Sequence, residues 1–454
     1  MKAKLKSQKA KYFFYLCLSV FICGSISVKA QNDGAEQNQT GRAGTFAIVG
    51  ARIVTVSGAV IENGTVVIQN GKISAVGATV SVPSGAEKID GKGLSVFPGI
   101  IDAGTNIGLS EIGQGVNASV DVAEVGTMNA NAKAIKGVNP HSVYVNVTRA
   151  NGITTVMSFP NGGLIAGQGT VINLNGSTQD EMAVVREFGL VINFPRIATF
   201  GGFGGGGFGG PPIEFSEAVK RRDTQLDELK KLFTAAQNYL RARDAYAKDK
   251  TLPYVASDVR FEAMEPYMRG DKPIIFTAER ERDIRSVAKF VAEMKVKGIV
   301  FGGEEAWKAA DELKKNNISV IYTNVWALPV QDDDPYDELF EAPGKMQAAG
   351  VKYCIASGSE NAVVRDLPYQ AGMAAGFGLS KEDALKSVTL YAAQVLGVDS
   401  QMGSIETGKM ANLVVADGDI LDARTNVKYV FIGGRIVPLT SRHTDLFNSF
   451  KDRK

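Results

Sequence analysis

Short apolar runs separated by turn residues fill the first part of the chain after residue 44. Asn-Gly pairs at 63–64 and 70–71 and a glycine at 58 separate these runs. Asn-Gly between β-branched runs is a strong hairpin signal, because both residues tolerate positive φ. The pattern therefore predicts a small antiparallel β unit with strands at 47–49, 52–56, 65–69 and 72–76.

The middle of the chain alternates between apolar strand-like runs and helical patterns. Apolar residues recur at helical spacing through 214–246, with shorter helices expected over 284–294 and 305–313. Buried strands that alternate with helices indicate parallel pairing, and this length favours a (β/α)8 TIM-like barrel in an α/β protein. The expected strands are 95–101, 153–158, 190–193, 273–277, 299–301, 318–322 and 352–356.

The chain ends in strands again, at 411–416, 427–432 and 435–437. We therefore expect a discontinuous small β-sandwich domain built from both chain ends, 45–95 and 402–438, around a barrel at 96–401. A stretch at 200–210 with eight glycines interrupts the barrel. It is interpreted as a flexible insertion, with a lid over a pocket as the alternative. Residues 31–44 form a flexible lead and 439–454 a polar tail.

The first thirty residues have the pattern of a signal peptide. Five lysines precede an apolar run at 12–22, and Val28-Lys29-Ala30 has the small-x-small pattern of a cleavage site. We expect an exported protein of the periplasm or cell envelope, with no membrane attachment after signal removal; a retained anchor is the alternative. Removal takes six lysines and no acid, so the net charge falls from +2 to about −4. That weak charge argues against nucleic acid as a partner.

Few residues remain that could bind a soft or borderline metal. Only Cys354 follows the signal segment, so neither an internal disulfide nor a thiolate cluster can form, and the thiol is expected to be a small buried hydrophobe. The chain has two histidines, His141 and His443, far apart in sequence. Neither has a ligand-spaced partner, and we expect structural or surface roles for both.

Three stretches together resemble the amidohydrolase superfamily, in particular its secreted imidazolonepropionase-like members. They are IVGAR through ENG and NGKISAVG at 48–77, FPGIIDA at 97–103, and LSKEDAL through GSIETGKMANLVV at 379–415. The resemblance implies a metal-dependent hydrolase of amide, usually cyclic amide, C–N bonds other than peptide bonds. In such enzymes zinc or another divalent metal lowers the pKa of bound water and polarises the carbonyl that is attacked.

The family's metal-ligand positions carry other residues in this chain. By the resemblance, two strand-1 histidines would stand at Gly104 and Asn106, and further ligands near Thr277, at Gly302 and at Ser359. We therefore expect a degenerate metal site and no cofactor, and no catalytic residue is assigned. An oxygen-only site built from Asp102, Glu111, Asp121, Glu279 or Glu360 is the alternative, and it would favour calcium or magnesium.

Residues that follow the strands of a barrel line its mouth, where binding sites lie. Two hypotheses remain open: an amidohydrolase-family hydrolase, or a catalytically inactive pseudoenzyme. The pseudoenzyme would bind a small polar ligand or partner a metal-bearing paralogous amidohydrolase, as a homo- or hetero-oligomer. The candidate mouth residues for a small polar molecule are Thr105, Asn106, Asn193, Arg196, Thr277, Glu279, Asn324, Ser357, Ser359, Glu360 and Asn361.

Overall fold

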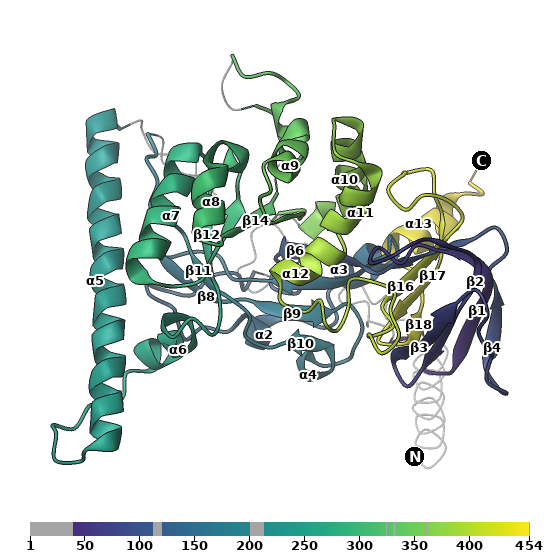
Figure 1. Ribbon diagram of the computed structural model, residues 1–454, viewed down its shortest axis with the longest axis horizontal. Helices are drawn as coiled ribbons and strands as arrows, with labels where there is room; N and C mark the ends of the chain where they lie inside the picture. Colours follow the sequence, from purple (N-terminus) through teal and green to yellow (C-terminus); the bar gives the residue numbers. More distant parts are fainter. Residues whose placement is uncertain are drawn as a thin grey trace, which may run out of the picture. The chain divides into compact units, whose positions relative to one another are not determined.

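Both ends of the chain contribute to one eight-stranded sheet in the computed structural model, which describes residues 40–111, 120–199, 213–323, 325–329, 333–358 and 361–453 (Figure 1). The strand order is β18-β17-β16-β5-β1-β2-β3, with β4 paired to β1. Phe46 on β1 and Phe431 on β17 are not on neighbouring strands, yet their rings lie 5.4 Å apart. The sheet therefore closes around an apolar core. Its strands are β1 (Phe46–Ile53), β2 (Ile61–Gln69), β3 (Lys72–Gly77), β4 (Glu87–Asp90), β5 (Ser95–Pro98), β16 (Leu413–Ala416), β17 (Val427–Ile432) and β18 (Arg435–Val437).

The two Asn-Gly pairs have different roles in this sheet. Asn70 and Gly71, with φ of 51° and 79°, form the predicted two-residue hairpin turn between β2 and β3. The turn expected at Asn63-Gly64 is wrong, because both residues lie within β2. Asn63 has φ of 50° beside a register shift in the pairing of β1 with β2. Positive φ there makes a β-bulge, and the chain reverses earlier, between Ile53 and Ile61.

The central strands form the predicted α/β fold, with one difference in direction. β6 and β7 are parallel, and β11 to β15 form a continuous parallel series. Between these groups, β8 pairs antiparallel with β11, and β9 pairs antiparallel with β7. Gly169 separates β8 from β9 along the chain. The strands are β6 (Ile100–Thr105), β7 (Ile153–Ser158), β8 (Ile165–Gln168), β9 (Thr170–Asn173), β10 (Ala183–Val185), β11 (Leu190–Ile192), β12 (Ile274–Ala278), β13 (Gly298–Gly302), β14 (Ser319–Tyr322) and β15 (Tyr353–Ile355).

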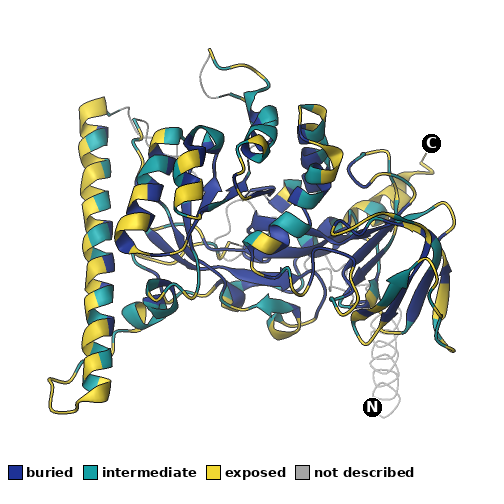
Figure 2. Cartoon of the chain, in the orientation of Figure 1, coloured by how far each residue is buried: buried dark blue, intermediate teal, exposed yellow. Residues whose placement is uncertain are grey.

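Helices cover these strands, and the longest is α5 (Phe215–Lys248), close to its predicted bounds of 214–246 (Figure 1). Figure 2 shows most of α5 exposed. Leu229 and Phe233 are buried on its inner face, and the Phe233 ring lies 5.0 Å from that of Phe290 on α7. The remaining helices are α2 (Ala134–Gly137), α3 (Val143–Arg149), α4 (Gln179–Met182), α6 (Val259–Met268), α7 (Glu281–Met294), α8 (Ala310–Lys315), α9 (Glu338–Ala348), α10 (Leu367–Gly376), α11 (Lys381–Ser387), α12 (Leu390–Val395) and α13 (Arg442–Phe450), with 3₁₀ turns at Ala306–Ala309 and Asn361–Asp366.

The space enclosed by the strands is filled with side chains. Met157, Ile275, Phe301 and Cys354 belong to one buried cluster, together with Leu396 just beyond α12. The prediction that Cys354 is a buried hydrophobe is confirmed. No helix in the described ranges is long and apolar enough to cross a membrane.

Candidate functional site at the barrel mouth

The carboxyl end of β6 holds a closed network of buried polar side chains. Thr105 Oγ1 donates to Asn361 Oδ1 at 3.2 Å, and Asn361 Nδ2 donates to the Asn106 carbonyl at 3.2 Å and the Ser110 carbonyl at 2.9 Å. Asn106 Nδ2 donates to the Phe159 carbonyl at 2.7 Å. These side chains satisfy one another, so the network joins β6 to the loop that follows β7 and to the segment after β15. It holds the mouth together.

Asp102 is completely buried beneath this network. Its carboxylate accepts hydrogen bonds from the Ser357 hydroxyl and, at 3.0 Å, from the Gly104 backbone N–H. Burial raises the pKa of Asp102 to about 7, although the bonds from Ser357 and Gly104 act to lower it. The bond to Ser357 joins β6 to the end of β15. The pair lies inside the protein, where it contributes to closure of the barrel.

Gly104, the first position where the family would have a histidine, has no room for a side chain. A Cβ built there would lie 2.3 Å from Phe301 Cε2. The Phe301 ring projects inward from β13 and packs edge-on against Phe159, with ring centroids 4.8 Å apart. The two rings occupy the space beside Gly104 that an imidazole would enter.

Gly302, the corresponding position on β13, is unfavourable for a side chain for two reasons. Its φ of 106° lies in a region that residues with a Cβ rarely adopt. A Cβ would also lie 2.3 Å from Glu279 Oε1 and 2.4 Å from Oε2. The carboxylate of Glu279, at the end of β12, therefore occupies the space beside Gly302.

The remaining donors do not supply a substitute metal site. His443, on α13, has its Nδ1 2.9 Å from a guanidinium nitrogen of Arg365. The His141 backbone N–H donates to Asn139 Oδ1, in the loop before α3. Among the described residues no three His, Cys, Asp or Glu side chains are grouped so that they could hold a metal ion. The donor set and the filled positions do not fit the divalent metal that the family implies.

The carboxylates considered for an oxygen-only site lie apart. Glu111 accepts hydrogen bonds from Asn139 Nδ2 at 3.1 Å and Ser142 Oγ at 3.0 Å, which hold the start of α3. Asp102 is enclosed at β6, and Glu279 lies beside Gly302 on β13. The described members do not form a site, because no three metal-binding side chains are grouped among the described residues. Glu360 lies outside the described residues.

A charged group beside Glu279 was not predicted from the sequence. Arg280 Nε lies 3.8 Å from Glu304 Oε2, and Arg280 Nη1 lies 3.5 Å from Glu305 Oε1. Burial raises the pKa of Glu304, while the positive charges of Arg280 and Arg196 act to lower it. Glu304 and Glu305 directly follow Gly302-Gly303, and their position after a predicted strand was the available signal.

The predicted mouth residues fall into separate groups. Thr105, Asn106, Ser357 and Asn361 come together around Asp102. Thr277 Oγ1 accepts from the Phe194 backbone N–H at 3.3 Å, and Asn193 Nδ2 donates to the Gly163 carbonyl at 2.8 Å. Arg196 is exposed, and its positive charge acts to lower the pKa of Glu304. Asn324, Ser359 and Glu360 lie outside the described residues.

The strands, their enclosing helices and the sheet built from both chain ends define an α/β protein of the TIM-barrel type. Residues 274–437 match the model of the Amidohydrolase family. The chain is 36% identical over 69 residues to an imidazolonepropionase from Pseudomonas aeruginosa, covering 15% of this chain and 16% of the relative. It is 53% identical over 38 residues to an imidazolonepropionase from Erwinia tasmaniensis, covering 8% and 9%. The matches thus span less than a fifth of either curated relative.

Solved structures extend the likeness over most of the chain. An amidohydrolase from Thermotoga maritima superposes with a TM-score of 0.76 at 26% identity, covering 87% of this chain and 100% of that one. A prolidase complexed with N-methylphosphonate-L-proline has a TM-score of 0.53 at 19% identity, covering 87% and 99%, which shows likeness of fold alone. The family match at 274–437 and the superposition on the Thermotoga maritima protein together support membership of the amidohydrolase superfamily.

Proposed function

We propose that this chain is an amidohydrolase-superfamily protein without the family's metal-dependent hydrolase centre, and that it acts as a binding module for a small polar ligand. The observation that carries the proposal is the filling of two ligand positions. The Phe301 ring lies against Gly104, and the Glu279 carboxylate lies against Gly302. A loss of ligands alone could be repaired by neighbouring donors, but here the space for two imidazoles is also occupied.

The remaining parts of the proposal come from the sequence. The segment at 1–30 has the pattern of a signal peptide, which supports a location in the periplasm or cell envelope. A metal-bearing paralogous amidohydrolase is the partner that such a module would serve in a hetero-oligomer.

Hydrolysis of cyclic amide C–N bonds is the second candidate function. The names of the two curated relatives favour it, although the matched stretches are 69 and 38 residues long. Chemistry of this kind would require a way to activate water and polarise a carbonyl. Among the described residues no three metal-binding side chains are grouped to hold such a metal, which is why we place binding first.

Metal content and turnover, measured on the same preparation, separate these functions. The mature chain is loaded with excess zinc, desalted and analysed by mass spectrometry, then assayed on a panel of cyclic amides. The imidazolonepropionase of Pseudomonas aeruginosa, treated identically, is the positive control. We expect no stoichiometric zinc and no turnover in a chain that is folded by circular dichroism. Stoichiometric zinc with turnover abolished by chelator and restored by metal would overturn the proposal, and metal-independent turnover would establish the second function.

A further inference from the structure

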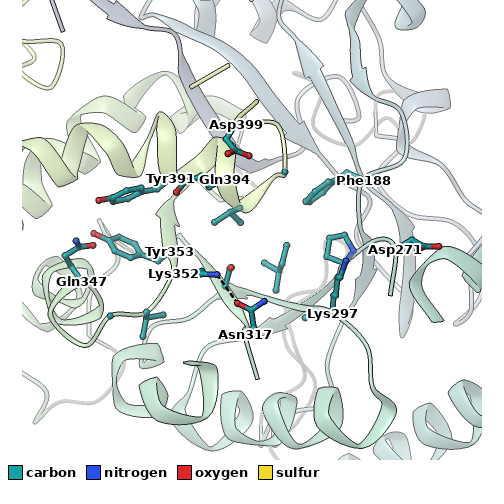
Figure 3. A pocket seen from close by; sticks show the side chains of 18 residues that line it. Phe188, Asp271, Lys297, Asn317, Gln347, Lys352, Tyr353, Tyr391, Gln394 and Asp399 are labelled. Carbon is teal, nitrogen blue, oxygen red and sulfur yellow. Dashed lines mark hydrogen bonds between the residues drawn. The ribbon is translucent and has the colours of Figure 1, made fainter. Parts of the chain in front are cut away.

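A hollow lies at the opposite end of the barrel from the mouth. It has a volume of about 750 Å³ and is lined where β12, β13, β14 and β15 begin, with α12 on one side (Figure 3). We call it the basal pocket and define it by Phe188, Lys297, Ile299, Lys352, Tyr353 and Tyr391. The amino ends of barrel strands usually serve stability, so an open cavity there calls for a separate explanation.

One part of the basal pocket is apolar and aromatic. Phe188 and Ile299 are 6% and 4% exposed and belong to the cluster that fills the barrel. The rings of Tyr353 and Tyr391 lie 6.3 Å apart, edge to face, along one side (Figure 3). Protein interiors are otherwise close-packed, and ligand cavities of this size combine apolar walls with a few polar groups. This part suits a flat apolar ring.

Two ammonium groups also line the basal pocket, one beside Asn317 and the other on the Phe188 side (Figure 3). Lys297 and Lys352 are both exposed, and neither forms an ion pair with a carboxylate in the part of the chain that the structure describes. Lys352 Nζ donates to Asn317 Oδ1 at 2.9 Å (Figure 3). The Asp271 carboxylate points away from the centre of the cavity, and Asp399 lies on the side across from the lysines. Either lysine therefore suits an anionic group.

We propose that the basal pocket binds an aromatic carboxylate, with its ring against Phe188 and Ile299 and its carboxylate at one of the two lysines, Lys297 or Lys352. Charge-assisted hydrogen bonds would fix the carboxylate, and burial of the ring would supply most of the remaining affinity. This site is separate from the mouth, so it stands whether the mouth hydrolyses a substrate, binds one or does neither.

The first test compares two probes that differ only in charge. N-acetyl-L-phenylalanine carries a carboxylate, and N-acetyl-L-phenylalaninamide replaces it with a neutral amide. Calorimetric titration of the mature chain should show the acid binding at least about tenfold more tightly, because hydrogen bonds to charged groups are about twice as strong as neutral ones. Equal affinities, or binding of neither probe, would overturn the proposal.

Variants then locate the site. Lys297→Gln with Lys352→Gln should weaken binding of the acid about tenfold and leave the amide almost unchanged. Val395→Trp, on the α12 side, should fill the cavity and weaken both probes; its fold is checked by circular dichroism. Lys289→Gln, an exposed lysine on α7 outside the pocket, is the matched control and should have no effect. Binding that survives the double lysine variant unchanged would refute the assignment, even if Val395→Trp does not fold.

Discussion

Gly104→Ala tests directly whether the imidazole position is filled. The new Cβ would lie 2.3 Å from Phe301 Cε2, too close for any normal contact, so the ring must move. The Phe301 ring packs against Phe159, with ring centroids 4.8 Å apart, and belongs to the buried cluster that fills the barrel. Overpacking of a close-packed core costs about 1–3 kcal/mol. Gly104 is not among the glycines with positive φ, so backbone strain adds little to the cost.

A double-mutant cycle separates this clash from a general effect of the substitution. Phe301→Ala alone removes a large ring and should cost about 3–5 kcal/mol. In the double variant the new methyl group enters the vacated space, so the combined loss should fall short of the sum by about 1–3 kcal/mol. Urea unfolding followed by circular dichroism gives each free energy of unfolding.

Gly376→Ala is the control for the cycle, because a Cβ at this position on α10 meets nothing within 4 Å. It should leave stability unchanged or raise it slightly, since alanine is the better helix former. A Gly104→Ala variant as stable as the parent chain, or strictly additive losses in the cycle, would show that the Phe301 ring does not fill the position.

Three further outcomes follow from the same structure. Burial raises the folded-state pKa of Asp102 to about 7, so the neutral carboxyl group stabilises the folded state below the unfolded pKa, and this contribution is lost as pH rises through about 7. The stability of Asp102→Asn should therefore increase relative to the parent chain between pH 4.5 and 8. A constant difference in urea midpoints over that range would contradict this. Gly104→His with Asn106→His should not restore zinc binding by mass spectrometry unless Phe301→Ala is added, and zinc bound without that change would contradict the filled-site argument. Gly71→Ala should cost about 1–2 kcal/mol in urea unfolding because φ is 79° at the hairpin turn, whereas Gly58→Ala, where no positive φ is required, should cost less.

The sequence could predict strand positions and helix α5 because each depends on local periodicity. It could not give the direction of β8 and β9, since IAGQGTVIN at 165–173 has too little apolar character to mark even one buried strand. The Asn-Gly pairs show a related limit. Turn chemistry at Asn63 correctly indicates positive φ, but positive φ serves a bulge as well as a reversal, and only pairing with β1 decides which.

At the mouth, motif alignment could show which ligand types are absent but not what replaces them. Phe301 and Glu279 approach Gly104 and Gly302 across strands, and such contacts leave no trace in spacing along the chain. The basal pocket was not predicted either, because its residues lie where strands begin and the sequence candidates are residues that follow strands.

The pairing of β5 with β16 has a consequence for how the chain is made. Val96 and Phe97 pair with residues 415 and 414, which are synthesised about 318 residues later. Until the ribosome has released nearly the whole polypeptide, one edge of β5 has no partner, and an open edge of this kind invites pairing with other chains. A product truncated just before residue 413 would therefore be expected to aggregate, even though its barrel segment is complete.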